Sequence, residues 1–162
     1  ETGDRPEVIG RYFDTVSICL SKGLGAPVGS VLVCKKEYET KARRMRKVFG
    51  GGMRQAGYLA AAGLYALQHH IGRLKEDHAR ARAIGEAAGK LAFVKSVMPV
   101  DTNIVIFELA PEVSPQRFLE ALAPHQVKAL AFSATEIRMV THLDFDDRML
   151  ERTVDVLRKL SF

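Results

Sequence analysis

Residues 17–30 read SICLSKGLGAPVGS, and this stretch decides how the rest of the sequence is interpreted. The apolar segment 14–20 predicts a short buried strand, and Lys22 follows it almost at once. Two glycines and Pro27 then interrupt any regular structure. The segment 28–34 is β-branched and apolar, which predicts a second strand. The sequence therefore places a lysine where a buried strand ends and a glycine-rich turn begins.

Two interpretations of Lys22 remain open at this point. A free lysine has a pKa of about 10.4, and burial with nearby cations lowers it enough to make the amine a nucleophile. The neighbouring glycines would leave room for a bulky ring. The alternative is a lysine whose stem lies along the strand end while its amine reaches solvent, and composition alone favours this alternative. A phosphate-binding loop is excluded, because its lysine follows the glycines instead of preceding them.

Two further basic patterns have competing interpretations. Residues 47–54 read KVFGGGMR, so three glycines lie between Lys47 and Arg54 at the start of an apolar helix. This arrangement is typical of an anion cradle at a helix N-terminus, and equally of an ordinary turn between helices. Arg138 lies within the apolar strand segment 137–140. An arginine there either binds a carboxylate through its two-pronged guanidinium or points to water, and exposure is the commoner case.

Composition excludes several classes of protein. The chain has 162 residues, 47% of them hydrophobic, which suits a packed core, and a formal net charge of +5. The excess charge is concentrated in residues 35–47 without any nucleic-acid-binding motif, so we expect no nucleic-acid partner. Cys19 and Cys34 lie in apolar segments and predict small buried side chains instead of a disulfide. No signal peptide or membrane-length apolar run is present, which predicts a cytoplasmic protein without a membrane partner.

The remaining polar side chains give no metal-binding pattern. No pair of histidines has convincing metal-ligand spacing. We expect solvated helix faces for the histidines at positions 69, 70 and 78. Three aspartates, at positions 144, 146 and 147, are typical of helix caps, and Asp144 or Asp146 is expected to cap the last helix.

The coarse pattern changes at about residue 72. The first part consists of apolar, glycine-broken segments, whereas the later part alternates helices and strands in a small α+β arrangement. Ser114 followed by Pro115 predicts a capped helix start. The expected elements are an exposed helix over 36–48, a buried apolar helix over 53–71, a charged helix over 73–91 with one apolar stripe, strands over 103–109, 127–132 and 136–141, and helices over 114–122 and from about 146 to 160.

These motifs together resemble a known family. The segment 17–30 closely resembles the cofactor-lysine segment of low-specificity L-threonine aldolases. GGGMRQ (50–55), followed by an alanine-rich helix, resembles the next block of that family. TN (102–103) before a strand and RMVTHLD (138–144) resemble the last two blocks. The resemblance covers essentially the whole chain, and the motifs occur in the expected order.

The resemblance implies an α/β protein of the fold-type-I class that depends on pyridoxal 5'-phosphate (PLP). Residues 1–72 would be the C-terminal portion of the large PLP-binding domain, and residues 73–162 the small C-terminal α+β domain. The implied activity is that of a lyase which cleaves β-hydroxy-α-amino acids, such as threonine or allo-threonine, to glycine and an aldehyde. The implied assembly is a homotetramer built as a dimer of dimers.

The resemblance also implies roles for four residues. Lys22 corresponds to the lysine that binds the cofactor covalently, and Arg138 to the arginine that binds the substrate carboxylate. Lys47 and Arg54 correspond to basic residues near the cofactor, which in these enzymes can serve a neighbouring subunit. No metal is implied.

The chain departs from the family by what it lacks. Family members are roughly twice as long, and the N-terminal half carries the aspartate for the pyridine nitrogen, the histidine that stacks on the ring and most of the phosphate-binding loop. We therefore expect that half as a partner, and an inactive chain without it. Two alternatives remain: another PLP lyase of the same superfamily that catalyses β-elimination, and a non-catalytic remnant that binds no cofactor.

Overall fold

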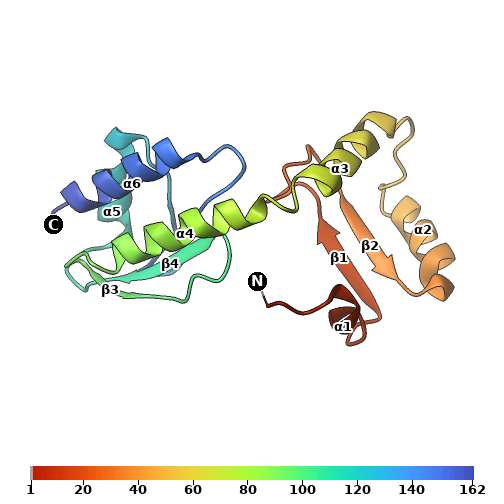
Figure 1. The fold of residues 1–162 in the computed structure, drawn as a ribbon, viewed down its shortest axis with the longest axis horizontal. Helices are drawn as coiled ribbons and strands as arrows, with labels where there is room; N and C mark the ends of the chain where they lie inside the picture. Colours follow the sequence, from red (N-terminus) through yellow and green to blue (C-terminus); the bar gives the residue numbers. More distant parts are fainter. Residues whose placement is uncertain (1) are drawn as a thin grey trace. The chain divides into compact units, whose positions relative to one another are not determined.

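The computed structural model of the chain describes residues 2–162. It divides into two compact units, Glu1–Gly72 and Arg73–Phe162, called here the first and the second unit (Figure 1). The two sheets have no strand in common, because one lies in each unit. Each unit is described by itself.

The first unit is built around a two-stranded sheet. Its elements are α1 (Pro6–Gly10), β1 (Thr15–Cys19), β2 (Ser30–Cys34), the short 3-10 helix η1 (Lys36–Tyr38), α2 (Glu39–Val48) and α3 (Gly57–His69). β1 and β2 are antiparallel, and Ser17 lies opposite Leu32. The two strands and the exposed basic helix confirm the expected elements of this part of the chain.

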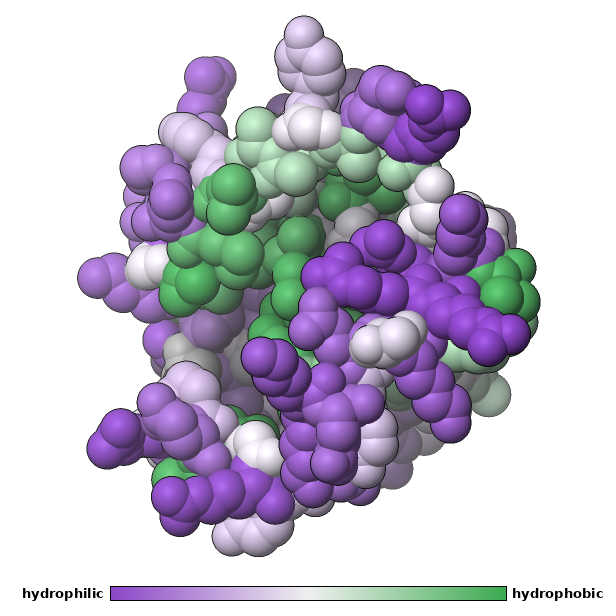
Figure 2. All heavy atoms as spheres, turned by 90° about the vertical axis from the view of Figure 1, so that its right-hand side faces the viewer, coloured by the Kyte–Doolittle hydropathy of each residue, from purple (hydrophilic) through white to green (hydrophobic). Residues whose placement is uncertain are grey.

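The expected burial of these elements is wrong for this chain. Every residue of β1 and β2 is exposed or half-buried, and the apolar Leu32 and Val33 expose about half of their surface (50% and 51%). In α3 only Gly63 and Ala66 are buried, while Tyr58 is 93% exposed. An isolated pair of strands and one helix cannot cover both faces of each other. Figure 2 shows the result as an area of apolar side chains at the surface.

The second unit is a layer of helices on a four-stranded antiparallel sheet. The strand order is β3-β4-β6-β5, and Figure 1 shows α4 and α6 next to each other over the sheet. Its elements are α4 (Leu74–Ala88), β3 (Val94–Val97), β4 (Ile104–Leu109), α5 (Pro115–Leu122), η2 (Ala123–His125), β5 (Leu130–Ala131), β6 (Glu136–Val140) and α6 (Asp147–Lys159).

The predicted helix caps of this unit are confirmed. The Ser114 hydroxyl accepts a hydrogen bond from the amide of Arg117 at 3.2 Å. Of the two candidate aspartates, Asp146 caps α6, because its carboxylate accepts from the amide of Met149 at 2.7 Å. Side-chain caps of this kind satisfy backbone donors that a helix start leaves free.

The strands of this unit differ from the expectation in two places. β3 was not expected, because four residues at a sheet edge give too short an alternation to detect. The strand expected over 127–132 is reduced to Leu130 and Ala131. It pairs only with β6, and the chain reaches it from the left-handed turn at Gln126, where φ is 60°. A pairing of two residues leaves the rest of that segment irregular.

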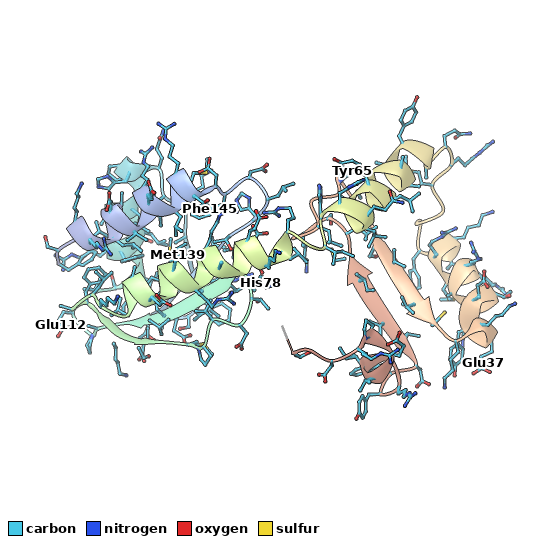
Figure 3. The ribbon with its side chains drawn as sticks, viewed as in Figure 1. Glu37, Tyr65, His78, Glu112, Met139 and Phe145 are labelled. Atoms are coloured by element: carbon cyan, nitrogen blue, oxygen red, sulfur yellow. The ribbon has the colours of Figure 1, made fainter. Side chains whose placement is uncertain are left out.

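Along the two central strands of the second unit, every second side chain is buried, and these side chains form the core. Val105, Phe107 and Leu109 of β4 and Ile137 and Met139 of β6 are all buried in one cluster with residues of the helices. Figure 3 labels Met139, one of them. The helices contribute buried side chains to the same cluster, among them Ile84, Phe118 and Leu157. The residues between the buried positions, including Arg138, therefore belong to the opposite, partly exposed face of the sheet.

The start of α4 contains a buried ion pair, and a separate hydrogen bond links it to the end of β6. Asp77 is fully buried, and the Arg73 guanidinium donates to both of its oxygens at 3.0 and 2.6 Å. The Thr141 hydroxyl donates to the Asp77 backbone carbonyl at 2.7 Å. The expectation for 73–91, a charged helix with one apolar stripe, missed the burial of Asp77. Arg73 is only four residues away, but the contact with Thr141 exists only when β6 is in place.

Candidate functional site

The turn that carries Lys22, residues 20–29, is held by backbone hydrogen bonds. The amide of Leu20 donates to the carbonyl of Gly29 at 2.9 Å, and the amide of Ala26 donates to the carbonyl of Leu20 at 3.0 Å. The amide of Gly25 donates to the Lys22 carbonyl at 2.8 Å. Gly25 and Gly29 have φ angles of 70° and 108°, which glycine adopts without steric cost. The backbone at Lys22 is therefore fixed on both sides.

The side chains of this turn are divided between the interior and the surface. Leu20, Leu24 and Ala26 are buried, whereas Lys22 is exposed. The Lys22 amine has no hydrogen bond or ion pair with any residue in the range 2–162. A side chain added at Gly29 would meet nothing within 4 Å, so space is open beside the turn. The amine is thus presented free on a rigid support, although this chain by itself does not bury it.

Cys19 lies at the end of β1, three residues before Lys22. Its thiol is 3.5 Å from the Ser21 hydroxyl. Hydrogen bonding to Ser21 and the positive charge of Lys22 lower the pKa of the Cys19 thiol. Cys19 and Cys34 are free, as the sequence predicted, because they lie at opposite ends of the β1–β2 pairing; both are half-buried instead of buried.

The glycines at 50 and 51 form the C-terminus of a helix. The amide of Gly50 donates to the Lys47 carbonyl at 3.1 Å, and the amide of Gly51 to the Arg46 carbonyl at 2.8 Å. With Gly50 at a φ of 81°, this is the Schellman arrangement at the C-terminus of α2. A Cβ at Gly51 would lie 2.9 Å from the Arg46 side chain, so only glycine fits. The amides of Gly50 and Gly51 are therefore already used within the chain and cannot bind an anion.

The two basic residues on either side of these glycines are exposed. Lys47 lies in the last turn of α2, and Arg54 lies in the turn before α3, which begins only at Gly57. Neither side chain has a hydrogen bond or ion pair within the described part of the chain. Both cations are therefore unpaired within the described residues.

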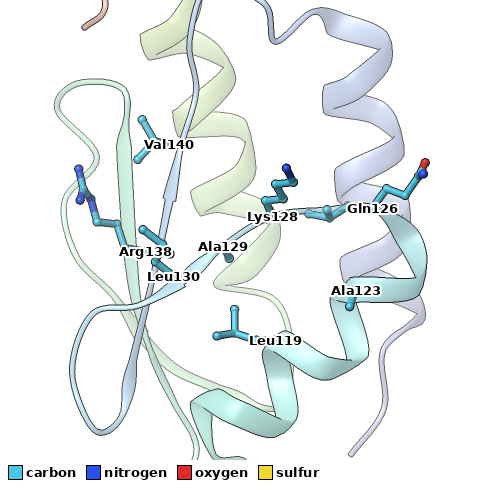
Figure 4. A pocket seen from close by; sticks show the side chains of 9 residues that line it. Leu119, Ala123, Gln126, Lys128, Ala129, Leu130, Arg138 and Val140 are labelled. Atoms are coloured by element: carbon cyan, nitrogen blue, oxygen red, sulfur yellow. The ribbon is translucent and has the colours of Figure 1, made fainter.

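Arg138 is half-buried in the middle of β6, opposite Ile106 on β4 and Leu130 on β5. It lines a cavity of about 760 Å³ whose other walls are mainly apolar (Figure 4). No carboxylate in residues 2–162 forms an ion pair with its guanidinium. Glu108, on the same face, is already paired with Lys95 at 2.8 Å, which lowers the pKa of the Glu108 carboxyl. Arg138 therefore offers an uncompensated cation beside an apolar wall.

The four predicted site residues divide between the two units. Lys22, Lys47 and Arg54 belong to the first unit and Arg138 to the second. Within the described residues, no cluster of three or more His, Cys, Asp or Glu side chains could hold a metal ion. Among the same residues, no helix combines the length and apolar character that crossing a bilayer requires.

Comparison with known proteins identifies the family. The sequence profile of the beta-eliminating lyases, described as "Beta-eliminating lyase", matches residues 1–112. The chain belongs to the beta-eliminating lyase family. Members of this family and the related aminotransferases are PLP enzymes as a general property of the family.

Relatives within this family carry aldolase names. The chain is 39% identical over 150 residues to the probable low-specificity L-threonine aldolase 2 of Arabidopsis thaliana, covering 91% of the chain and 42% of that protein. It is 42% identical over 142 residues to the low specificity L-threonine aldolase of Escherichia coli K12, covering 88% of the chain and 41% of that protein. The chain thus spans about two fifths of the length of these relatives.

Solved structures confirm the fold. A putative L-allo-threonine aldolase from Listeria monocytogenes matches with a TM-score of 0.75 at 20% identity, over 96% of this chain and 47% of that one. The histidinol-phosphate aminotransferase from Clostridium acetobutylicum matches with a TM-score of 0.61 at 13% identity, over 98% of this chain and 49% of that one. The predicted α/β fold class, as part of the fold-type-I architecture, is therefore correct.

The residues of this beta-eliminating lyase fit the family's cofactor. A covalently held aldehyde needs a primary amine that is accessible and unpaired, and within the described residues the exposed Lys22 amine is both. The first unit lacks a described carboxylate with an evident role beside Lys22, so the chain supplies only part of such a site.

Sequence reasoning missed one residue beside this turn. The ring Nδ1 of His70 lies 2.6 Å from the carbonyl oxygen of Leu24, two residues after Lys22. The expectation of a solvated histidine is therefore wrong for His70. No local signal could have revealed this contact, because its two partners are 46 residues apart in sequence.

Proposed function

We propose that the full-length protein containing this chain cleaves β-hydroxy-α-amino acids, such as threonine or allo-threonine, to glycine and an aldehyde with PLP as cofactor. The observation that supports this most strongly is the unpaired Lys22 amine on a hydrogen-bonded, glycine-containing turn. Aldolase names among relatives about 40% identical over most of the chain support the same reaction.

Lys22 would hold the cofactor. Its exposed amine provides the covalent attachment, while the buried side chains of Leu20 and Leu24 keep the turn in place. When bound, PLP supplies an electron sink for the electron pair left at Cα after the Cα–Cβ bond breaks. The hydroxyl proton of the substrate leaves in that step, and Cα takes up a proton to give glycine.

Arg138 would bind the substrate carboxylate. Its guanidinium lacks a carboxylate partner in the described chain, and a two-pronged guanidinium matches a carboxylate geometrically. Lys47 and Arg54 would attract the anionic cofactor or substrate, in the same subunit or in a neighbouring one.

The remaining organisation belongs to the same proposal. Residues 1–72 would complete the large cofactor domain together with an N-terminal half, and residues 73–162 would form the small domain. We propose a homo-oligomer arranged as a dimer of dimers, located in the cytoplasm. The exposed apolar strands of the first unit support the need for further protein around them.

The test uses the full-length protein with threonine and PLP. We expect glycine and acetaldehyde in equal amounts, and a loss of at least about 10³-fold in rate for Lys22→Ala, because the residue holding the cofactor is removed. Borohydride reduction and peptide mapping should label Lys22. Lys36→Ala, which changes another exposed lysine, is the control and should keep full activity.

Two results would contradict the proposal. A label on Lys47 with none on Lys22 would overturn the assignment of the lysine. Release of a keto acid and ammonia in place of glycine and an aldehyde would favour the β-eliminating alternative, which the family description itself suggests.

A further inference from the structure

We propose that α3 supports the Lys22 turn and that His70, directly after this helix, is a positioning residue for Lys22. This inference rests on the proposed role of Lys22. It concerns how the chain holds the lysine in place, before any cofactor is bound.

The first attachment of the turn to α3 lies before Lys22 in sequence. Leu20 is buried and packs against Gly63 of α3. A Cβ placed at Gly63 would lie 3.1 Å from Cδ1 of Leu20, which is tighter than ordinary van der Waals contact. The glycine therefore lets the strand end approach the helix closely.

The second attachment lies after Lys22. The Leu24 carbonyl accepts a hydrogen bond from Nδ1 of His70 at 2.6 Å, and because a carbonyl can only accept, Nδ1 must carry the proton. No other hydrogen bond to this carbonyl is present among residues 2–162. Lys22 is thus bracketed by Leu20 on Gly63 and by Leu24 on His70.

The His70 ring is itself oriented by an aromatic neighbour. Tyr65 of α3, labelled in Figure 3, meets His70 edge-on, with ring centroids 5.5 Å apart. Its centroid also lies 4.3 Å from that of the His69 ring. His70 is half-buried, whereas His69 is exposed and makes no hydrogen bond to the turn in the described residues. The two adjacent histidines therefore provide a matched pair, of which only one touches the turn.

The position of the amine matters for its chemistry. A displacement of about 1 Å of a reacting group can cost about 10²-fold in rate. Loss of the His70 hydrogen bond would free the Leu24 carbonyl and loosen the segment between the two attachments. We therefore expect weaker retention of PLP and faster opening of the turn, with little change in overall stability.

The experiment compares three variants of the full-length protein. His70→Leu removes the donor, His70→Asn keeps an N–H donor close to the position of Nδ1 in a side chain shaped like leucine, and His69→Ala is the control. Hydrogen exchange of the Gly25 and Ala26 amides is measured without PLP, because both amides are bonded within the turn. The PLP dissociation constant and the melting temperature are measured on the same samples.

We expect exchange to be roughly 2- to 12-fold faster in His70→Leu, the range that corresponds to one net hydrogen bond, with a similar weakening of PLP binding. His70→Asn should restore both values, and His69→Ala should match the parent. If His70→Leu does not fold, His70→Ser, whose hydroxyl is too short to reach Leu24, takes its place.

Two outcomes would overturn the inference. One is unchanged exchange and PLP binding in His70→Leu. The other is His70→Asn exchanging and binding PLP as poorly as His70→Leu, because the N–H donor would then not explain the effect. Either result, obtained with Lys22 still labelled by borohydride, contradicts the role of His70 alone, whereas an unlabelled Lys22 contradicts the proposed function.

Discussion

The two units of this chain bury their apolar side chains to very different degrees. The second unit has thirteen buried apolar residues in one cluster between its sheet and helices. In the first unit the buried apolar side chains are Leu20, Leu24, Ala26 and Ala66, and the strands stay open on both faces. The unit that carries the proposed cofactor lysine is therefore the one that is incomplete by itself.

This difference has a physical explanation. Two strands and single helices bury too little apolar surface to offset the conformational entropy lost on folding. The few buried residues of the first unit are concentrated at the Lys22 turn, so the local geometry of the turn is maintained where the rest of the unit is open. The second unit contains the complete sheet and helix layer required for a core.

The strongest test of the comparison separates the two units. We expect residues 73–162 expressed alone to fold cooperatively, because their core is complete, and residues 1–72 alone to remain unfolded or to aggregate through their exposed strands. Dispersion of amide signals in NMR spectra and thermal melts followed by circular dichroism measure both. A dispersed spectrum with a cooperative melt for residues 1–72 would break the comparison.

A second test measures how much the buried core contributes to the free energy of unfolding of the second unit. Phe118 is fully buried and meets Phe107 edge-on, with centroids 5.6 Å apart. Phe118→Ala in residues 73–162 should lower the free energy of unfolding by about 3–5 kcal/mol in urea titrations. Phe132 is 56% exposed, so Phe132→Ala is the control and should change it by less than about 0.5 kcal/mol. Equal effects of both substitutions would show that this unit has no dominant core.

The smallest expected effect is that of Arg138→Lys, which separates the proposed role of the second unit from that of Lys22 in the first. Arg138→Lys in the full-length protein keeps the charge but loses the two-pronged contact, which is worth roughly 1.5–3 kcal/mol. We expect substrate binding to weaken by about tenfold to a hundredfold, with kcat less affected than in Lys22→Ala. Steady-state kinetics with threonine measure this, and Arg158→Lys on the surface is the control. Unchanged affinity would show that Arg138 does not bind the substrate carboxylate.

Local patterns predicted those elements whose signals lie within a few residues. The helix start at Ser114 and the cap at Asp146 were predictable, because a cap and the amide it binds are three residues apart. β3 and most of the segment around β5 were not, since their extent depends on pairing with distant strands. The glycines at 50–52 illustrate an intermediate case: the sequence marked a special backbone, but only the hydrogen bonds to Arg46 and Lys47 identified it as a helix end.

By itself, the sequence determined the family, most of the elements and the candidate residues Lys22 and Arg138, because motifs and periodicity are local properties of a chain. The tertiary structure alone decided which apolar segments find a covering layer, that the Asp77 carbonyl is bonded to Thr141, and that His70 reaches Leu24. Each of these depends on side chains or carbonyls that are distant in sequence or on surface area removed from water. Such quantities exist only after the elements have packed.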